Sequence, residues 1–270
     1  MAMTIAFVVP VCRPDVLKAN FMMSPAVHRS DSHQVILQEG FSSAAVAFND
    51  AIDRAEHDYL VFCHEDVYFP ENWLEDLQRA VNTLDRTDPR WGVLGCAGRT
   101  RDNVHRGYVF SNGLGVLGNA FEAPLPVQTL DELVLVLRKS SGLRFDERLP
   151  HFHFYGADIC LQAVDRGLTP YAINAFCIHN TQQITALPRE FYECARYVRR
   201  KWRAHVPIQT TCIRLTRTNL PLLRMLAHDF CSRHLAKPEG RARRPKLDEL
   251  LTELAPVLAC GADASRCSSV

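Results

Sequence analysis

The stretch FNDAIDRAEHDYLVFCHEDVYFPENWLEDL, residues 48–77, decides the fold. Its centre is the apolar run 59–63, which is typical of a strand buried on both faces of a sheet. His64, Glu65 and Asp66 follow this run directly, and a helix signal begins after the next proline, with acidic residues in its first turn and apolar residues on one side. The stretch therefore predicts a buried strand, a polar loop and an amphipathic helix in succession.

The same alternation extends outward over the N-terminal part of the chain. Strand signals lie at 4–9, 34–37, 59–63 and 92–97, and helix signals lie at 16–23, 42–55 and 71–84. This order predicts an α/β fold with a mainly parallel central sheet flanked by helices. Residues 98–150 hold short β-like segments between glycines and prolines, which predicts an antiparallel insertion.

The C-terminal part is predicted to be mostly helical. Helix signals lie at 157–166, 188–202, 220–235 and 247–258, a strand signal lies at 171–178, and a basic, proline-containing linker lies at 241–246. Because the last helix carries leucines on one face, we expect that face to pack on the rest of the chain or on a second subunit. Residues 260–270 are predicted to form a disordered tail.

Composition excludes several classes of protein. The chain has 270 residues, of which 47% are hydrophobic and 23% are charged, as in soluble globular proteins. A net charge of +1 offers no electrostatic reason to expect binding to nucleic acid. No apolar run approaches the roughly 18–20 residues of a membrane span. The 10 cysteines form no CxxC pair and several lie in apolar runs, which predicts buried reduced thiols and a cytoplasmic protein.

The polar residues after the buried strand are the first candidates for chemistry. In open α/β sheets, ligands bind in the crevice at the carboxyl ends of the strands. His64, Glu65 and Asp66 offer nitrogen and oxygen ligands there, which suit a divalent cation held against a diphosphate. The alternative is a solvated loop that binds nothing, because short motifs often occur by chance.

Stretch 48–77 resembles family 2 glycosyltransferases with the A-type, Rossmann-like fold, and its HxD form most resembles their StrF-type branch. The resemblance implies that Asp66 coordinates the Mg²⁺ or Mn²⁺ that bridges the diphosphate of the donor. It also implies that His64 and Glu65 line the donor site, where His64 replaces an aspartate that contacts the ribose or uracil side. The matching features are Asn49, Ala55, the run 59–63, the HED triplet in the place of the DxD motif, Pro70, Trp73 and Leu74.

A second stretch, LRFDERLPHFHFYGADICLQAVDRGLTPYAI (143–173), resembles the block of the family that carries the catalytic base. The resemblance aligns Asp158 with that base, which takes the proton of the acceptor hydroxyl. The residues agree that Asp158 is distinctive, because it follows Gly156 and Ala157 at the start of a helix, where backbone N–H groups stabilise negative charge. The alternative is an ordinary capping residue.

The third stretch of the resemblance is AFCIHNT, residues 175–181. Here an apolar strand ends in His179, and the resemblance implies that this histidine is a further ligand of the metal or the diphosphate. The alternative is a structural histidine with satisfied hydrogen bonds.

The N-terminal VVPVCR, residues 8–13, resembles the opening strand of the family. The resemblance places Pro10, Cys12 and Arg13 in the nucleotide pocket. Glu39, after the second strand, is the closest match to the acidic residue that binds the base or ribose.

The resemblance covers about residues 4–205. It implies a catalytic domain at 1–205 that transfers a sugar, hexosyl or related, from a nucleotide-diphosphate donor to an acceptor hydroxyl, with Mn²⁺ or Mg²⁺ and with inversion. The acceptor is an unknown sugar, lipid or small molecule, and the number of subunits is open. Residues 206–270 form a helical extension, of which 237–270 are expected to be dispensable for donor binding.

Two other functions remain open at this point. A nucleotide-sugar-binding or interaction protein that has lost catalysis is favoured slightly by the missing first aspartate of DxD and by Cys160, which stands where the family has a second aspartate. A nucleotidyltransferase has a related sheet, but the first strand is not followed by a glycine-rich signature that bears Arg or Lys.

Overall fold

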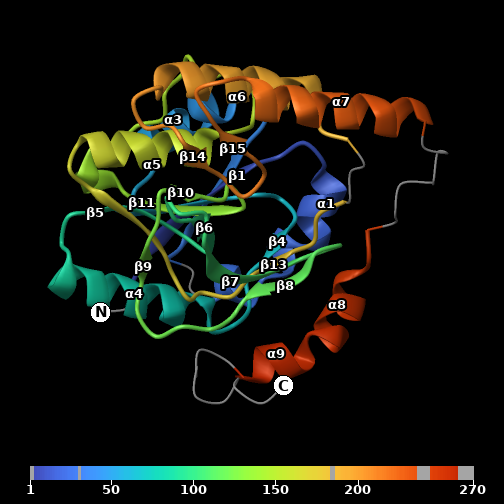
Figure 1. Cartoon of the computed structure of the whole chain (residues 1–270). Coiled ribbons are helices and arrows are strands. Elements are labelled where there is room, and N and C mark those ends of the chain that lie inside the picture. The colour runs from blue at the N-terminus through green and yellow to red at the C-terminus, as the bar shows by residue number, and fades with distance from the viewer. Residues whose placement is uncertain (1–2, 30–31, 183–185, 236–243, 261–270) are drawn as a thin grey trace.

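The computed structural model of the chain describes residues 3–29, 32–182, 186–235 and 244–260 (Figure 1). Its central sheet has 7 strands in the order β2-β1-β3-β11-β5-β12-β9. These strands are β1 (Ile5–Pro10), β2 (Gln34–Gln38), β3 (Tyr59–Cys63), β5 (Trp91–Gly95), β9 (Leu125–Pro126), β11 (Val134–Arg138) and β12 (Thr169–Ala172). The predicted α/β class is therefore confirmed.

The sheet is mixed, with five of its seven strands in one direction, in agreement with the mainly parallel sheet predicted from the sequence. β1 runs parallel to β2 and β3, but β11 lies between β3 and β5 and is antiparallel to both. The four residues Val134–Leu137 are all buried, so β11 suits a central position. The chain reaches this strand from the insertion rather than from a crossover helix, and its direction is reversed for that reason.

A second sheet forms from the insertion and from the ends of the central strands. It has 6 strands in the order β10-β6-β7-β13-β4, with β8 paired to β7. The strands are β4 (Val67–Tyr68), β6 (Ala97–Arg99), β7 (His105–Ser111), β8 (Gly115–Gly118), β10 (Thr129–Leu130) and β13 (Ile178–His179). Since β6, β7 and β8 pair antiparallel in succession, this part agrees with the predicted antiparallel insertion.

Helices cover both faces of the central sheet. In Figure 1, α3, α5, α6 and α7 lie together on one side and α4 lies on the other. Alternate residues of β1 follow the same division: Ala6 and Val8 pack in one core cluster, and Ile5, Phe7 and Val9 pack in the other. The helices are α1 (Pro14–Ala19), α2 (Pro25–His28), α3 (Ala44–Arg54), α4 (Trp73–Thr87), α5 (Tyr155–Asp165), α6 (Arg189–Lys201) and α7 (Leu220–Leu235), and short 3₁₀ turns lie at Phe21–Met23 and Lys139–Ser141.

The structure shows no break in packing at residue 205. A hairpin of β14 (Ile208–Gln209) and β15 (Arg214–Leu215) follows α6, and Ile208 and Leu215 are buried in the same core cluster as α3, α5 and α6. The boundary that was predicted from the motifs therefore marks where the resemblance ends rather than where packing ends.

The predicted last helix is divided into α8 (Leu247–Glu253) and α9 (Ala255–Cys260). Its apolar face packs on this chain: Leu247, Leu250 and Leu254 form one buried cluster with Tyr68, Phe110 and Ile178 of the second sheet. Residues 241–243 of the predicted linker and 261–270 of the predicted tail lie outside the described residues.

Two further expectations concern cysteines and membranes. Eight described cysteines are free thiols, and five of them are buried, as the sequence predicts: Cys63, Cys96, Cys160, Cys177 and Cys194. None of the described helices combines the length and the apolarity that crossing a bilayer requires.

Candidate functional site

Three predicted side chains meet beyond the carboxyl end of β3. The ligand atoms of His64, Asp66 and His179 all lie within 4.8 Å of one another. His64 and Asp66 lie in the turn between β3 and β4, and β13 brings His179 to them because it pairs antiparallel with β4. The Asn180 N–H also donates to the main-chain carbonyl of Asp66 at 2.9 Å. We call His64, Asp66 and His179 the triad.

The charge of Asp66 is fixed by its neighbours. Its Oδ1 lies 3.3 Å from Nε2 of His179, and its Oδ2 lies 3.0 Å from Nη2 of Arg244. Burial alone would raise the pKa of Asp66, but the hydrogen bond from His179 and the charges of His179, His64 and Arg244 hold that pKa well below its usual range. Asp66 is therefore ionised at neutral pH.

A hydrogen-bond chain selects the tautomer of His64. Its Nε2 lies 3.1 Å from the hydroxyl of Tyr155, and that hydroxyl donates to the main-chain carbonyl of Glu132 at 3.0 Å. Because the only proton of the hydroxyl is used there, His64 must donate from Nε2, and Nδ1 keeps its lone pair. Burial and the charge of His179 lower the pKa of His64, which favours the neutral ring. Nδ1 of His64 faces His179 and lies 3.5 Å from its Nε2.

The triad suits a divalent transition metal. Two imidazoles and one carboxylate form a ligand set that binds Mn²⁺ and its neighbours in the first row, and three protein ligands leave coordination positions open for substrate oxygens. His179 also has an outer partner, because its Nδ1 lies 3.4 Å from the hydroxyl of Ser111.

Glu65 has a different role from its neighbours. Its Oε2 accepts from the main-chain N–H groups of Cys12 and Arg13, both at 2.9 Å. It therefore ties the loop after β1 to the loop after β3 instead of pointing at the triad. The expectation that Glu65 lines the donor site stays a prediction.

The other predicted nucleotide-binding residues lie along the same edge of the sheet. β1, β2 and β3 are parallel neighbours, so their carboxyl ends bring Pro10, Cys12, Arg13 and Glu39 to the edge that holds His64. Cys12 and Glu39 are exposed, and the Arg13 side chain is 46% exposed. Their roles in binding a nucleotide stay predictions.

The structure encloses the carboxylate of Asp158, the predicted catalytic base, among donors of two helices. Asp158 is 1% exposed, and its carboxylate accepts from Trp202 Nε1 at 2.6 Å, from Gln162 Nε2 at 2.8 Å and from Lys201 Nζ at 2.8 Å. These donors lie on α5 itself and at the end of α6, so the carboxylate closes a helix–helix contact. We therefore propose that Asp158 supports the fold.

This assignment predicts a loss of stability rather than a loss of chemistry. Asp158→Ala leaves the buried Trp202 N–H without its acceptor, while Lys201 keeps Asp146 as a partner at 2.7 Å. We therefore expect a loss of about 1–3 kcal/mol, the cost of an unsatisfied buried donor. Urea unfolding followed by circular dichroism measures this change. The control is Asp165→Ala on the same helix, whose carboxylate side chain is 53% exposed and pairs with His205, and it is expected to cost about 1 kcal/mol or less. Equal stability of the two variants contradicts the assignment.

Two residues near the triad were not singled out from the sequence. Glu132 lies between β10 and β11 and accepts from the Gly156 N–H at 3.3 Å, at the first turn of α5. Arg244 comes from the segment before α8 and pairs with Asp66. An acidic residue before a strand and an arginine in a basic linker are common patterns, so the sequence held no signal that distinguishes either one.

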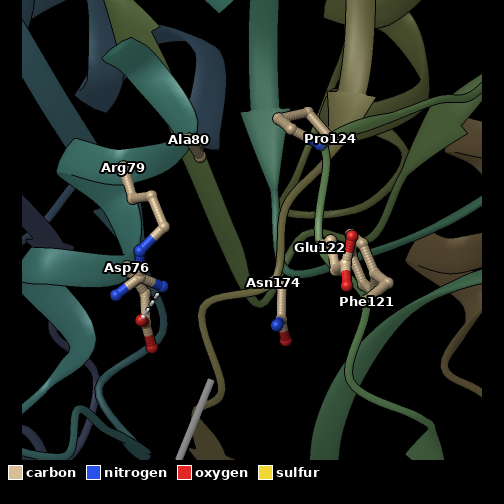
Figure 2. A pocket seen from close by; sticks show the side chains of 7 residues that line it. All are labelled: Asp76, Arg79, Ala80, Phe121, Glu122, Pro124 and Asn174. Carbon is tan, nitrogen blue, oxygen red and sulfur yellow. Dashed lines mark hydrogen bonds and ion pairs between the residues drawn. The ribbon is translucent and has the colours of Figure 1, made fainter. Parts of the chain in front are cut away.

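A separate cavity of about 400 Å³ lies beside α4 (Figure 2). Asp76 and Arg79 of α4 are paired at 2.8 Å on one wall, and Asn174 and Glu122 face them from loops of the other wall. The cavity shares no lining residue with the triad. It therefore adds nothing to the metal site.

Comparisons of the sequence with known proteins find a family match and a relative. Residues 27–110 match a family model described as glycosyl transferase family 2. A protein of Fuscovulum blasticum, named ATP synthase subunits region ORF 6, is 33% identical over 165 residues, which are 58% of this chain and 64% of that protein. The match therefore spans less than two thirds of the relative's length.

Two solved structures are distantly similar. The mannosyltransferase PcManGT from Pyrobaculum calidifontis, in complex with GDP-Man and Mn²⁺, is 14% identical, with a TM-score of 0.46 and coverage of 97% of this chain and 77% of that chain. TarS 1-349 from S. aureus, in complex with UDP-GlcNAc, is 14% identical, with a TM-score of 0.45 and coverage of 97% and 88%.

The family model spans α3, β3 and the loop that carries His64 and Asp66. Assignment to the StrF-type branch stays a prediction. The resemblance that the sequence shows to glycosyl transferase family 2 is confirmed over residues 27–110 of this chain.

Proposed function

We propose that this chain is a metal-dependent glycosyltransferase that moves a sugar from a nucleotide-diphosphate donor to an acceptor hydroxyl. The observation that carries the proposal is the triad, which gathers two histidines and an ionised carboxylate at the carboxyl edge of the sheet. This is the edge at which α/β sheets bind their ligands. The match to glycosyl transferase family 2 over residues 27–110 supports the same reaction class.

Each member of the triad has a separate part in holding the metal. Asp66 would supply a negative oxygen, His64 would supply Nδ1, and His179 would supply Nε2. When bound, Mn²⁺ or Mg²⁺ would supply positive charge for the leaving diphosphate. The nitrogen ligands favour Mn²⁺ over Mg²⁺, which prefers oxygen.

We assign the general base to Glu132 in place of Asp158. The Tyr155 hydroxyl connects the main-chain carbonyl of Glu132 to His64, and the Glu132 carboxylate accepts from the N–H of Gly156, the residue after Tyr155. Burial and the charge of Asp131 raise the pKa of Glu132 to about 8, although N–H groups of α5 oppose the shift. A base with a pKa near the working pH is the most effective one.

The proposed transfer is an inverting displacement. The acceptor oxygen forms a bond to the anomeric carbon while the bond from that carbon to the donor diphosphate breaks. The acceptor proton goes to the Glu132 carboxylate, and the diphosphate leaves with the electron pair. The proposal also includes a hexosyl or related donor, an acceptor that is a sugar, a lipid or a small molecule, and a cytoplasmic location.

Hydrolysis of nucleotide sugars with Mn²⁺ tests the proposal, because transferases often release sugar to water and no acceptor is needed. We expect slow release of a nucleoside diphosphate from one member of a panel of UDP, GDP and dTDP sugars. Binding without any release would favour a silent nucleotide-sugar-binding protein. Release of pyrophosphate from a nucleoside triphosphate would favour a nucleotidyltransferase.

Removal of His179 is expected to weaken metal binding moderately. In His179→Ala, water can take the vacant coordination position, so we expect the affinity for Mn²⁺ to fall about tenfold. Electron paramagnetic resonance of free Mn²⁺ measures the affinity. The control is His228→Ala, whose side chain is 77% exposed on α7. Unchanged affinity in His179→Ala would return this histidine to a structural role.

A further inference from the structure

Arg244 pairs with Asp66 of the triad, although the two residues are far apart in the sequence. Its Nη2 lies 3.0 Å from Oδ2 of Asp66, and its side chain is 15% exposed. Asp66 lies in the loop before β4, in the N-terminal part of the chain, whereas Arg244 lies just before α8. A cation from this remote segment is therefore built into the surroundings of the metal ligands.

The residues that follow Arg244 are held in place by a hydrogen bond and by packing. The side-chain amide of Asn180 donates to the main-chain carbonyl of Pro245 at 3.1 Å, and Asn180 itself is 1% exposed. Immediately afterwards, Leu247 of α8 is buried against the second sheet. These contacts hold the segment 244–247 against the strand that carries His179.

The guanidinium has unused donors. Among the residues that the structure describes, Nε and Nη1 of Arg244 have no hydrogen-bond partner, although both are buried. A buried donor without an acceptor is unfavourable, so a group that supplies acceptors would bind there favourably. The fork of Nε–H and Nη–H groups matches the oxygens of a phosphate.

A second guanidinium lies close to the first. Nε of Arg13 lies 3.8 Å from Oε1 of Glu65, the residue that precedes Asp66, and Asp66 pairs with Arg244. Two neighbouring arginines are held together at this edge by Glu65 and Asp66, and an anion would relieve their repulsion.

The two oxygens of Asp66 separate the metal from the arginine. Oδ1 faces His179 inside the triad, and Oδ2 faces Arg244. A metal held through Oδ1 therefore leaves the pair with Arg244 in place. The metal and the guanidinium would lie on either side of one carboxylate, which is a suitable arrangement for two phosphate groups.

We infer that Arg244, together with Arg13, binds the diphosphate of the donor, so that the segment before α8 completes the donor site. This inference rests on the proposed function, because the diphosphate is that of the nucleotide-sugar donor. It reverses the expectation that residues 237–270 are dispensable for donor binding. Because Nε and Nη1 have no solvent contact, the Arg13 side chain or the segment 244–247 must shift when the diphosphate enters.

The test is calorimetric titration of Arg244→Gln with two probes. The probes are inorganic pyrophosphate without metal, and UDP or GDP with Mn²⁺. We expect both affinities to fall about 10- to 100-fold, as for the loss of charge-assisted hydrogen bonds, and Arg244→Lys to recover only part of the loss. The control is Arg203→Gln, which removes an exposed arginine after α6. Circular dichroism verifies that each variant is folded.

The outcomes separate this inference from the proposed function. Nucleoside diphosphate binding that Arg244→Gln leaves unchanged overturns the inference and leaves the transferase intact. Tighter binding of Mn²⁺ and of the probes by Arg244→Gln also overturns it, because Arg244 would then be a plug that competes with the metal. The wild-type chain could bind pyrophosphate, with a loss in Arg244→Gln, and yet bind no nucleoside diphosphate. That result overturns the proposed donor, but it leaves an anion site at Arg244. A wild-type chain that binds neither probe overturns both.

Discussion

Glu132→Gln is expected to lower glycosyl transfer by about 10²- to 10⁴-fold, with donor and metal binding nearly unchanged. Glutamine keeps the oxygen that accepts from the Gly156 N–H, so the first turn of α5 stays in place. It cannot accept the proton of the acceptor hydroxyl. Initial rates at saturating donor and Mn²⁺ measure the effect, with hydrolysis of the donor as the reaction if no acceptor is known.

The pH profile adds a second readout for Glu132. A pKa raised to about 8 means that the carboxylate ionises near pH 8, so the wild-type rate should rise with pH through that range. The rising limb should disappear in Glu132→Gln and persist in the control Glu190→Gln, an exposed acid in the first turn of α6. Near-normal turnover of Glu132→Gln, or an unchanged pH profile, would exclude Glu132 as the base.

Asp66→Ala is expected to abolish binding of Mn²⁺, with a loss in affinity of at least about 100-fold, and with it the metal-dependent binding of nucleoside diphosphates. Asp66 supplies the only carboxylate of the triad, and two neutral imidazoles alone bind the ion weakly. Isothermal titration with Mn²⁺, followed by UDP or GDP, measures both affinities.

The variant also removes the acceptor of Arg244 and His179, so its stability must be measured beside its affinity. Asp66→Asn serves as the second variant, because it keeps the size and one acceptor oxygen. The control is Glu71→Ala, an exposed acid farther along the same segment. If a folded Asp66→Asn variant retains the full affinity for Mn²⁺, the metal site does not lie at the triad.

The sequence alone determined the elements whose signals are local. The run 59–63 is a strand with the predicted bounds, because four of its five residues are buried apolar residues and a polar triplet ends it. The same reasoning placed Asp66 directly after a buried strand and His179 at the end of an apolar strand. The two strands belong to different sheets, and the pairing of β13 with β4 brings the two side chains together. The helix predicted at 42–55 also formed, with Ser43 accepting from the Val46 N–H at its start.

Only the tertiary structure decided which polar side chains face the site. Asp158 lies in the first turn of α5 as predicted, but Lys201 and Trp202, more than 40 residues later, enclose its carboxylate. Glu132, the proposed base, precedes β11 and lies near the end of β3 because β11 is antiparallel to β3. Arg244 pairs with Asp66, which is 178 residues away in the sequence. Local patterns fix where an element begins and which face is apolar. The partners of a polar group depend on how distant elements pack, because neutralising a buried charge or satisfying a buried donor is possible only where another part of the chain arrives.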